Sequence, residues 1–540
     1  MFSNKKLAVA VSGAVLLMAG QFALADSTTD IVDALVSKAV LTEEEGKLIS
    51  KGAKTQKEAE AKAAKAKEFD FINSDAPFKY ETKLAGHDAN IQFYGIIDIG
   101  GAHVNHTLNP NSNLPNSIYP YSYDAAGGPS NKGVASRSTW IQGGLQDSRF
   151  GLKGDVSLFE AMDNKFKLIY QFEGGFDPLT GSLNNAAKAL SQNWDPVKNN
   201  AKLNSTFADS SLNGDFFARQ AWAGVDGGNL GKVSYGIQYN PFYDIAGAYD
   251  PNHKADSFSP LGESGAIGGG GGLSPNARMK NSLKYANSFE APMDGKVNVV
   301  GMYQFGNDIN AEWGRGYAGQ IGYENSLFGF QLAYNNFTDT VKVDVATSPG
   351  DGSTLKAGLY DTQAFMATAK YTPSKEIKFS GGYEWMQLSQ PTDKSISYGS
   401  LYGYSILGGV AIPANNSSKS VGSTNGGDHQ NIDFWWAGGE YDFGQRFAAL
   451  DGLTLSGAYY YTKYGTIDGS DGSGIAPAVG KDFHINTETV VLDYKLNKRF
   501  DVYGAATWNQ FGGTYVDVTS SSIMANKDVN AYGVGVRMKF

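Results

Sequence analysis

Six histidines and no cysteine are the residues from which this sequence would have to build a metal or nucleophilic site. His103 and His106 are three residues apart, which on an extended strand places them on opposite faces and disfavours a shared metal ion. The glycine run 268–272 lacks the Gly-Lys-Ser/Thr that completes a phosphate loop, so we interpret it as a flexible connection. No local motif marks a nucleophile with a histidine and an acid. The sequence therefore predicts no enzyme, no metal site and no cofactor.

The composition favours many aromatic strands joined by turns. The 540 residues include 67 glycines, 30 phenylalanines and 30 tyrosines, and glycine exceeds its usual share of about 7%. Acidic residues (54) outnumber basic ones (45), giving a formal charge of −9, which disfavours a nucleic-acid partner. After the first 25 residues no apolar run approaches the ~20 residues of a membrane helix. A helical membrane protein is excluded, whereas a membrane barrel is not.

The N-terminal region differs from the rest of the chain. Lys5 and Lys6, an apolar run over residues 7–19 and Ala23-Leu24-Ala25 predict a signal peptide over residues 1–25 and therefore export. Residues 26–88 are expected to form a periplasmic segment with two short α-helical stretches and a linker, because helical spacing and an Ala, Lys and Glu-rich run precede residue 68. A solvated tether and a short coiled coil between protomers both remain open.

From residue 91 onward the hydrophobic period changes from 3.6 to 2, which is typical of strands with two different faces. In residues 328–335, for example, Phe328, Phe330, Leu332 and Tyr334 alternate with small or polar residues. About sixteen such segments occur, most near the ~9–11 residues that a tilted strand needs to cross a bilayer. They are residues 91–101, 140–157, 165–174, 215–225, 231–239, 279–288, 295–305, 316–324, 327–336, 361–371, 375–386, 431–442, 452–462, 485–495, 499–511 and 530–540.

The connections between these segments alternate between long and short, which is typical of a membrane barrel with short periplasmic turns and long outer loops. Closure is required because each unpaired backbone group in hydrocarbon costs several kcal/mol. Phe540, Met538 and Val536 lie at alternate positions of the last segment, and a terminal Phe resembles the signal that the barrel-assembly machinery recognises. We therefore predict that residues 89–540 form an all-β, antiparallel transmembrane barrel of about 16 strands in the bacterial outer membrane.

Several segments resemble the general bacterial porin family, particularly its β-proteobacterial members. The matching stretches are FYGIID (93–98), SRFGLKG (148–154), QFEGGFD (171–177), RQAWAGV (219–225), NSLKY (281–285) and the terminal Phe540. They occur in the family's order and cover the barrel. The resemblance implies a sixteen-stranded homotrimer with an aqueous pore for small hydrophilic solutes. It also implies that the third long connection, about 240–278, folds into the pore and narrows it.

The resemblance further implies that acids on this inner connection face basic residues on the wall and filter solutes by charge. The acids are Asp244, Asp250, Asp256 and Glu263, while alternation puts Arg149 and Lys153 on the polar face of their strand, with Arg219 nearby. Gln238 stands where the family usually has a basic residue, so this wall is expected to hold one charge fewer. We take these eight residues as candidates for the constriction.

The predicted function is passive diffusion of small hydrophilic solutes and ions through an outer-membrane porin. The alternatives are a solute-selective porin for organic anions, phosphate or sugars, and a non-conducting barrel that anchors the envelope or presents adhesive loops. Aromatic residues such as Trp435 and Tyr459 are interpreted as an interfacial girdle, with a sugar-guiding track inside the pore as the alternative. The expected partners are outer-membrane lipid and lipopolysaccharide, the assembly machinery and two further copies of the chain.

Overall fold

The computed structural model describes the barrel but little of the N-terminal region. It describes residues 44, 76–107, 135–179, 181, 216–217, 219–263, 277–306, 315–338, 341–346, 354–359, 361–389, 404–406, 410–412, 429–464, 483–513 and 528–540. The predicted signal peptide and both predicted helical stretches lie outside the described residues. The chain divides into two units, Met1–Phe71 and Ile72–Phe540, and the structural account below concerns the second.

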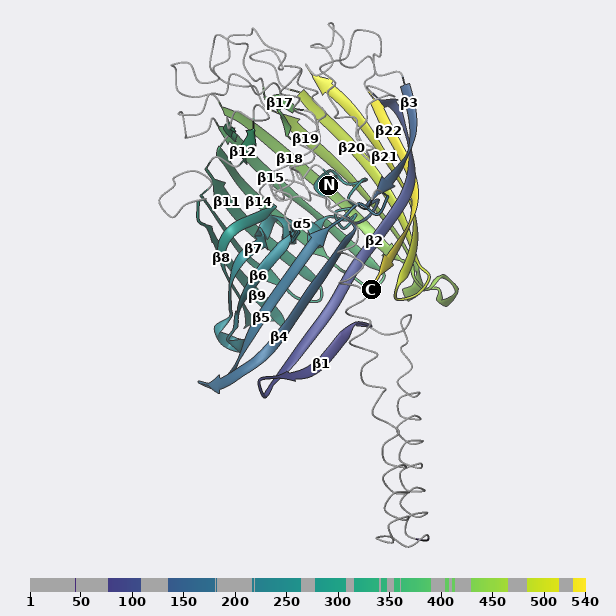
Figure 1. Ribbon diagram of the computed structural model, residues 1–540. Helices are drawn as coiled ribbons and strands as arrows, with labels where there is room; N and C mark the ends of the chain where they lie inside the picture. The colour runs from purple at the N-terminus through teal and green to yellow at the C-terminus, as the bar shows by residue number, and fades with distance from the viewer. Residues whose placement is uncertain are drawn as a thin grey trace. The chain divides into compact units, whose positions relative to one another are not determined.

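The second unit is built from antiparallel strands that follow one another around a ring (Figure 1). The strands of this sheet are β1 (Lys79–Leu84), β2 (His87–Thr107), β3 (Ala135–Gln142), β4 (Arg149–Ala161), β5 (Asn164–Gly175), β6 (Gln220–Asp226), β7 (Lys232–Tyr239), β8 (Arg278–Ala291), β9 (Gly295–Gln304), β10 (Gly316–Glu324), β11 (Phe328–Phe337), β14 (Asp361–Tyr371), β15 (Ile377–Ser389), β18 (His429–Asp442), β19 (Leu453–Tyr464), β20 (Phe483–Lys495), β21 (Phe500–Gly513) and β22 (Asp528–Lys539).

The remaining elements lie in connections. They are the hairpins β12 (Val341–Ala346) with β13 (Thr354–Leu359) and β16 (Tyr404–Ile406) with β17 (Val410–Ile412), the helices α5 (Pro241–Tyr249) and α6 (Pro260–Glu263), and the 3-10 turns η1 (Gly228–Leu230), η3 (Phe443–Gln445) and η4 (Ala448–Leu450). Among the described residues, no helix combines the length and apolar composition that crossing a bilayer needs.

The ring closes where β22 pairs with β2, from Ile96 opposite Lys539 to Val104 opposite Ala531. The other edge of β2 pairs with β3 and then with β4, which lie end to end and act as one interrupted strand. With β3 and β4 counted as one position, and the β1 hairpin left aside, the closed barrel has sixteen strand positions. This confirms the predicted fold. It also splits the segment predicted over residues 140–157 into two strands.

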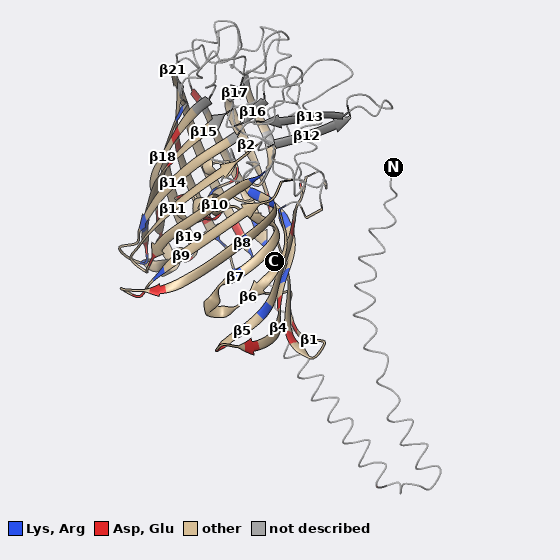
Figure 2. Cartoon of the chain, turned by 90° about the vertical axis from the view of Figure 1, so that its left-hand side faces the viewer, with Lys and Arg blue, Asp and Glu red and all other residues tan. Residues whose placement is uncertain are grey.

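The barrel wall has an apolar outer face and a polar inner face, which is the reverse of the arrangement in a water-soluble protein. Many large apolar side chains are exposed on the outside, among them Leu168, Val233, Leu283, Ile321, Leu332, Phe365, Trp435, Leu455, Val490 and Val534. Buried polar side chains line the inside, among them Gln331, Thr368, Ser380, Thr487 and Asn509. Figure 2 shows charged residues mainly near the strand ends of the face in view, with few along the middle of the strands. A hydrocarbon exterior and a polar interior produce this distribution.

Tyr239 departs from the alternation of its strand. Residues 233–239 predict it on the apolar face with Val233 and Tyr235, which are indeed exposed. The pairing of β7 with β8 shifts register after Gly236, which lies opposite Ser282 and has φ +139°. On β8, Asn281 next to Ser282 has φ 49°. This irregularity turns the Tyr239 ring inward. Its hydroxyl consequently reaches side chains of the barrel interior.

Candidate constriction of the barrel

The connection after β7 enters the barrel through α5. Asn240 caps this helix, because the Phe242 amide donates to the Asn240 side-chain oxygen at 3.0 Å, and Pro241 suits the first turn. The apolar face of α5 is buried, with Phe242 at 0% and Ile245 at 2% exposure. The helix contacts β10, β11, β14 and β15, and Figure 1 shows it within the ring of strands. Burial of this face fixes the connection against one side of the interior.

The segment after α5 is attached further around the barrel wall, to β19. Asp250 is fully buried and accepts hydrogen bonds from the Tyr460 hydroxyl at 2.6 Å, the Ser259 hydroxyl at 2.6 Å and the Lys254 amide at 2.8 Å. The Asn252 amide also donates to the Asp250 carboxylate, at 3.2 Å. Because Tyr460 belongs to β19, Asp250 both shapes the turn and ties it to the wall.

Further contacts continue this attachment to β20 and β22. The Thr489 hydroxyl of β20 donates to the Phe258 carbonyl at 2.9 Å. The Phe258 ring lies under Gly533 of β22, where an added Cβ would stand 2.5 Å from the ring. Residues 240–263, which we call the inner loop, therefore span the interior from β7 to β18–β22.

The tip of the inner loop rests on the break between β3 and β4. Asp98 holds that break open, because its buried carboxylate accepts from the amides of residues 144, 145 and 146 at 3.2, 3.0 and 2.9 Å. The Tyr503 hydroxyl also donates to Asp98 at 2.7 Å. The Ser257 hydroxyl then donates to the Gly143 carbonyl at 2.9 Å. Asp98 thus positions the backbone that receives the loop.

A buried ionic network faces the start of the inner loop. Arg219 is 2% exposed and donates to Asp147 at 2.7 Å and to Glu173 at 2.8 Å. Its Nη2 nitrogen donates to the hydroxyls of Tyr239 and Tyr243, each at 3.1 Å. The two tyrosine rings stack at 4.0 Å. Because two carboxylates surround it, Arg219 joins β5, β7 and α5 and presents no uncompensated charge of its own.

Other cations surround this network. The Arg149 guanidinium lies 3.6 Å from the Glu173 carboxylate, the Arg278 guanidinium carbon lies 5.9 Å from the centre of the Tyr239 ring, and the Lys254 ammonium lies over the Tyr243 ring. With Arg219, these make four cations against the three carboxylates of the cluster. The cluster comprises Arg149, Arg219, Lys254, Arg278, Asp147, Glu173 and Asp256.

The pKa of the Tyr243 hydroxyl on α5 depends on the electrostatic potential that this charge cluster creates. Burial by itself raises the pKa of the Tyr243 hydroxyl, but the cations Lys254, Arg219, Arg278 and Arg149 outweigh it and lower that pKa to about 8. A tyrosine with a depressed pKa requires a positive surrounding potential. The described part of the interior is therefore electropositive beside α5.

The eight predicted constriction residues fall into four groups: members of the charge cluster, exposed residues, buried residues, and one residue whose side chain is not described. Arg149, Arg219 and Asp256 belong to the charge cluster, and Lys153 is exposed with its ammonium 5.2 Å from the centre of the Tyr94 ring. Asp244 is an exposed α5 residue that pairs with Lys284 at 3.4 Å. Two residues are buried and bonded in place, namely Asp250 and Gln238, whose amide donates to the Ser282 carbonyl at 3.0 Å. Glu263 ends α6, and its side chain lies outside the described residues, as does the glycine run 268–272.

Sequence reasoning did not single out Glu173, Asp147, Tyr243 or Lys254. A usable signal existed for Glu173, because Gln171 and Glu173 alternate with apolar residues in an otherwise aromatic segment. Asp147 precedes the β4 strand in a stretch predicted to be continuous strand. Lys254 and Tyr243 lie in a connection whose path no periodicity specifies.

The predicted assembly signal forms the seam of the barrel. Phe540 exchanges two backbone hydrogen bonds with Gly95, at 2.9 and 3.0 Å, and its ring meets that of Phe78 edge-on at 6.1 Å. Val536 is 50% exposed on the outer face. The last residue therefore lies beside the first barrel strand, which suits a role in closure.

The chain is similar to a family model and to several solved structures. A family model described as Gram-negative porin matches residues 61–354, more than half of the chain. No curated protein matches the chain. Similar solved structures include an anion-selective porin from Comamonas acidovorans (17% identity, 84% of this chain and 100% of that chain covered, TM-score 0.48). They also include outer-membrane expressed OmpT of Vibrio cholerae (13%, 85% and 100%, 0.46) and Salmonella typhi OmpF (16%, 85% and 100%, 0.42).

Proposed function

The chain belongs to the Gram-negative porin family, and from this premise we propose that the inner loop forms the constriction of its pore. The protein is an outer-membrane channel for passive diffusion of small hydrophilic solutes and ions. The observation that carries the proposal is the path of the inner loop, which runs from β7 across the interior to β18–β22. A solute that passes this loop meets the charge cluster, which joins the start of the loop to the wall through Arg219 and Tyr243.

We also propose that the protein has no catalytic activity, that it assembles as a homotrimer, and that residues 26–88 form a periplasmic segment after cleavage of a signal peptide. The family supports a channel without chemistry on its solutes. The residues that line such a pore bind and release solutes unchanged, so they select solutes by charge and size.

The function is tested by single-channel recording of the purified protein in a planar bilayer. Large ohmic steps, closing in threes for a trimer, would support an open pore. A small conductance blocked by one particular solute would favour the solute-selective alternative instead. Folded and inserted protein that remains silent would contradict the pore and favour an envelope anchor.

We further propose that the constriction prefers anions. The cluster holds four cations against three carboxylates, and Lys153 adds an exposed cation on the same wall. Positive potential inside a narrow lumen attracts anions and repels cations. The reversal potential across a KCl gradient should therefore have the sign of chloride selectivity.

Lys153→Glu is expected to shift this selectivity toward cations, changing the permeability ratio roughly threefold or more because the charge lies in the lumen. Lys165→Glu is the matched control, since it reverses an exposed lysine at the start of β5. Lys165 lies opposite Glu160 of β4. At ~3.3 Å per residue, Glu160 is about 23 Å along β4 from Lys153. This separation is well beyond a Debye length of ~8 Å. If the two variants have equal reversal potentials, Lys153 does not lie at the constriction.

Raising the pH through about 8 is expected to weaken the anion preference. The pKa of Tyr243 is lowered to about 8, so Tyr243 is neutral well below that pH and carries a negative charge well above it. The reversal potential should fall toward zero over this interval. In Tyr243→Phe the change should largely disappear, whereas Tyr303→Phe, on the outer face of β9, should titrate like the wild type. A retained transition in Tyr243→Phe would assign it to another group.

A further inference from the structure

The inner loop carries one histidine, His253, whose side chain reaches the barrel wall at β18. Its Nε2 nitrogen donates to the Glu440 carboxylate, and the Lys378 ammonium of β15 lies 3.7 Å from the same carboxylate. Glu440 has the parity of the buried Phe434 and Trp436 on β18, so it faces the barrel interior. The His253 side chain is 52% exposed. An ionisable group of the loop is therefore open to the water of the interior.

The backbone of the loop sets the direction of the His253 side chain. His253 and Lys254 have φ 52° and 58°, left-handed values that residues other than glycine rarely adopt. The Asp250 carboxylate accepts from the Lys254 amide at 2.8 Å, and the Asp250 carbonyl accepts from the His253 amide at 2.9 Å. These bonds hold the turn. Lys254 consequently lies over the Tyr243 ring in the charge cluster, whereas His253 reaches β18.

The group formed by His253, Glu440 and Lys378 is separate from the charge cluster. Five strands, β9, β10, β11, β14 and β15, lie between β18 and β8, which carries Arg278 of the cluster. Lys378 and Glu440 lie near strand ends that lead into the short connections 372–376 and 443–452. Short connections are periplasmic in membrane barrels. The interior thus carries a second charged group, toward the periplasmic ends of β15 and β18.

The charges around His253 leave its own protonation as a net change. Glu440 and Lys378 balance each other. On β19 the residue paired with Glu440 is the uncharged Ser456. The other charged groups on the surrounding elements are Lys370 of β14 with its partner Glu324 of β10, Lys495 of β20, and Asp250 and Lys254 of the loop itself. Histidine changes its charge between about pH 5 and 8.

We propose that His253 determines how the ion selectivity of the pore depends on pH below neutrality. The protonated imidazolium adds one positive charge to the interior at β18, whereas the neutral imidazole leaves the balanced Glu440 and Lys378 pair. Acid therefore strengthens the preference for anions. The inference rests on the proposed constriction, because the inner loop holds His253 in the path of the ions. It concerns another residue and a lower pH range than the Tyr243 transition at about 8.

The test is the reversal potential of the purified full-length protein across a KCl gradient, with the same pH on both sides, from about pH 7 to about pH 5. This acidification should raise the chloride-to-potassium permeability ratio roughly twofold, the effect of one unit charge about 8 Å away in water. His253→Arg keeps the positive charge and should hold the ratio at its acid value. His253→Gln should hold the ratio at its neutral value. A structural role alone would move both variants in the same direction.

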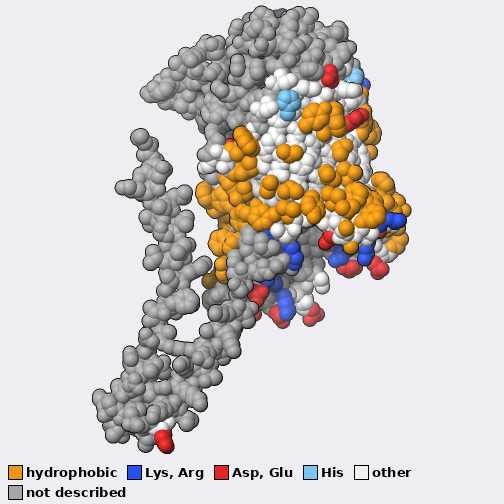
Figure 3. Space-filling view, turned by 90° about the vertical axis from the view of Figure 1, so that its right-hand side faces the viewer, with side chains coloured by type: hydrophobic (Ala, Val, Ile, Leu, Met, Phe, Trp, Pro, Cys, Tyr) orange, Lys and Arg blue, Asp and Glu red, His pale blue; other side chains and the backbone are white. Residues whose placement is uncertain are grey.

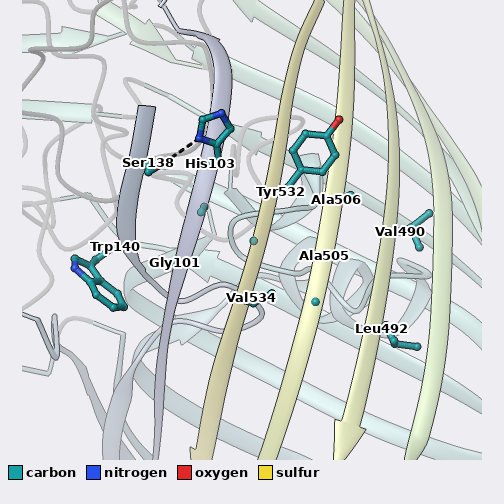
Figure 4. Close-up of a pocket in the computed structure, with 13 residues that line it drawn as sticks. Gly101, His103, Ser138, Trp140, Val490, Leu492, Ala505, Ala506, Tyr532 and Val534 are labelled. Atoms are coloured by element: carbon teal, nitrogen blue, oxygen red, sulfur yellow. Dashed lines mark hydrogen bonds between the residues drawn. The ribbon is translucent and has the colours of Figure 1, made fainter. Parts of the chain in front are cut away.

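His103→Gln is the matched control. His103 lies on the outer face of β2, where it hydrogen-bonds the Ser138 hydroxyl at 2.9 Å (Figure 4). Figure 3 shows histidine side chains on the outside of the barrel, beyond one edge of its hydrophobic band. A charge there faces away from the lumen, so His103→Gln should keep the wild-type response to pH.

Glu440→Gln identifies the group that titrates. It should keep a response to pH, because the imidazole is still present. A response that is lost in Glu440→Gln and kept in His253→Gln would belong to the carboxylate and would overturn the proposal. Equal permeability ratios in His253→Arg and His253→Gln would also overturn it. A conducting protein without a pH response in this range refutes the role of His253 and leaves the pore standing, whereas inserted protein that carries no current contradicts the pore itself.

Discussion

Asp250→Ala is expected to raise the single-channel conductance, roughly twofold or more, by releasing the inner loop from the far wall. The buried Asp250 carboxylate accepts four hydrogen bonds, and one of them comes from Tyr460 on β19. A hydrogen bond to a charged group contributes about 1.5–3 kcal/mol, so several are lost together. The far half of the loop then has fewer contacts that hold it across the interior, and the lumen widens. Single-channel recording in symmetric KCl measures the effect.

Two further variants provide an intermediate case and a control for the expected rise in conductance. Tyr460→Phe removes one of the four hydrogen bonds and keeps the ring, so its conductance should lie between wild type and Asp250→Ala. Asp244→Ala, on the exposed face of α5, removes only a pair with Lys284 at 3.4 Å and should leave the pore width unchanged. If Asp250→Ala conducts like the wild type while its β-barrel content is intact, the inner loop does not limit the current.

The strands could be predicted because the side-chain period is a local property of the sequence. The segment predicted over residues 316–324 is identical to β10, and that over 327–336 differs from β11 by one residue at each end. The break between β3 and β4 could not be predicted in this way. The carboxylate that holds it belongs to Asp98, on the neighbouring strand. The break depends on a partner distant in sequence, whereas alternation describes only the strand itself.

The same distinction applies to the constriction. Alternation places Arg149 and Lys153 on the inner face of β4, and the structure agrees. No local pattern shows that Arg219 is enclosed by Asp147 and Glu173, because the three residues come from different elements. Nor does composition show that Asp250 is a buried anchor whereas Asp244, six residues earlier on the same loop, is exposed. The sequence shows which of these residues are charged, but it does not show which of them are buried.

Arg219→Met is expected to cost about 3–5 kcal/mol of unfolding free energy, the range found when one partner of a buried ion pair is removed. Arg219, Asp147 and Glu173 are buried together, and Arg219 bonds both carboxylates. Methionine fills much of the volume but removes the guanidinium that pairs with both buried carboxylates, while Glu173 keeps its contact with Arg149 at 3.6 Å. Urea unfolding of the barrel in lipid vesicles measures the loss.

The response to pH separates charge from packing in this variant. Lowering the pH protonates the two stranded carboxylates, so the stability gap between Arg219→Met and wild type should narrow in acid. A packing defect would leave the gap constant. Adding Asp147→Asn and Glu173→Gln to Arg219→Met removes the uncompensated charge and should recover part of the lost stability at neutral pH, whereas Arg219→Lys should be intermediate, since lysine keeps the charge without the planar fork. A triple variant no more stable than Arg219→Met would show that Arg219 stabilises the barrel by filling space. The arginine would then be a packing residue and not the centre of an ionic network that joins β5, β7 and α5.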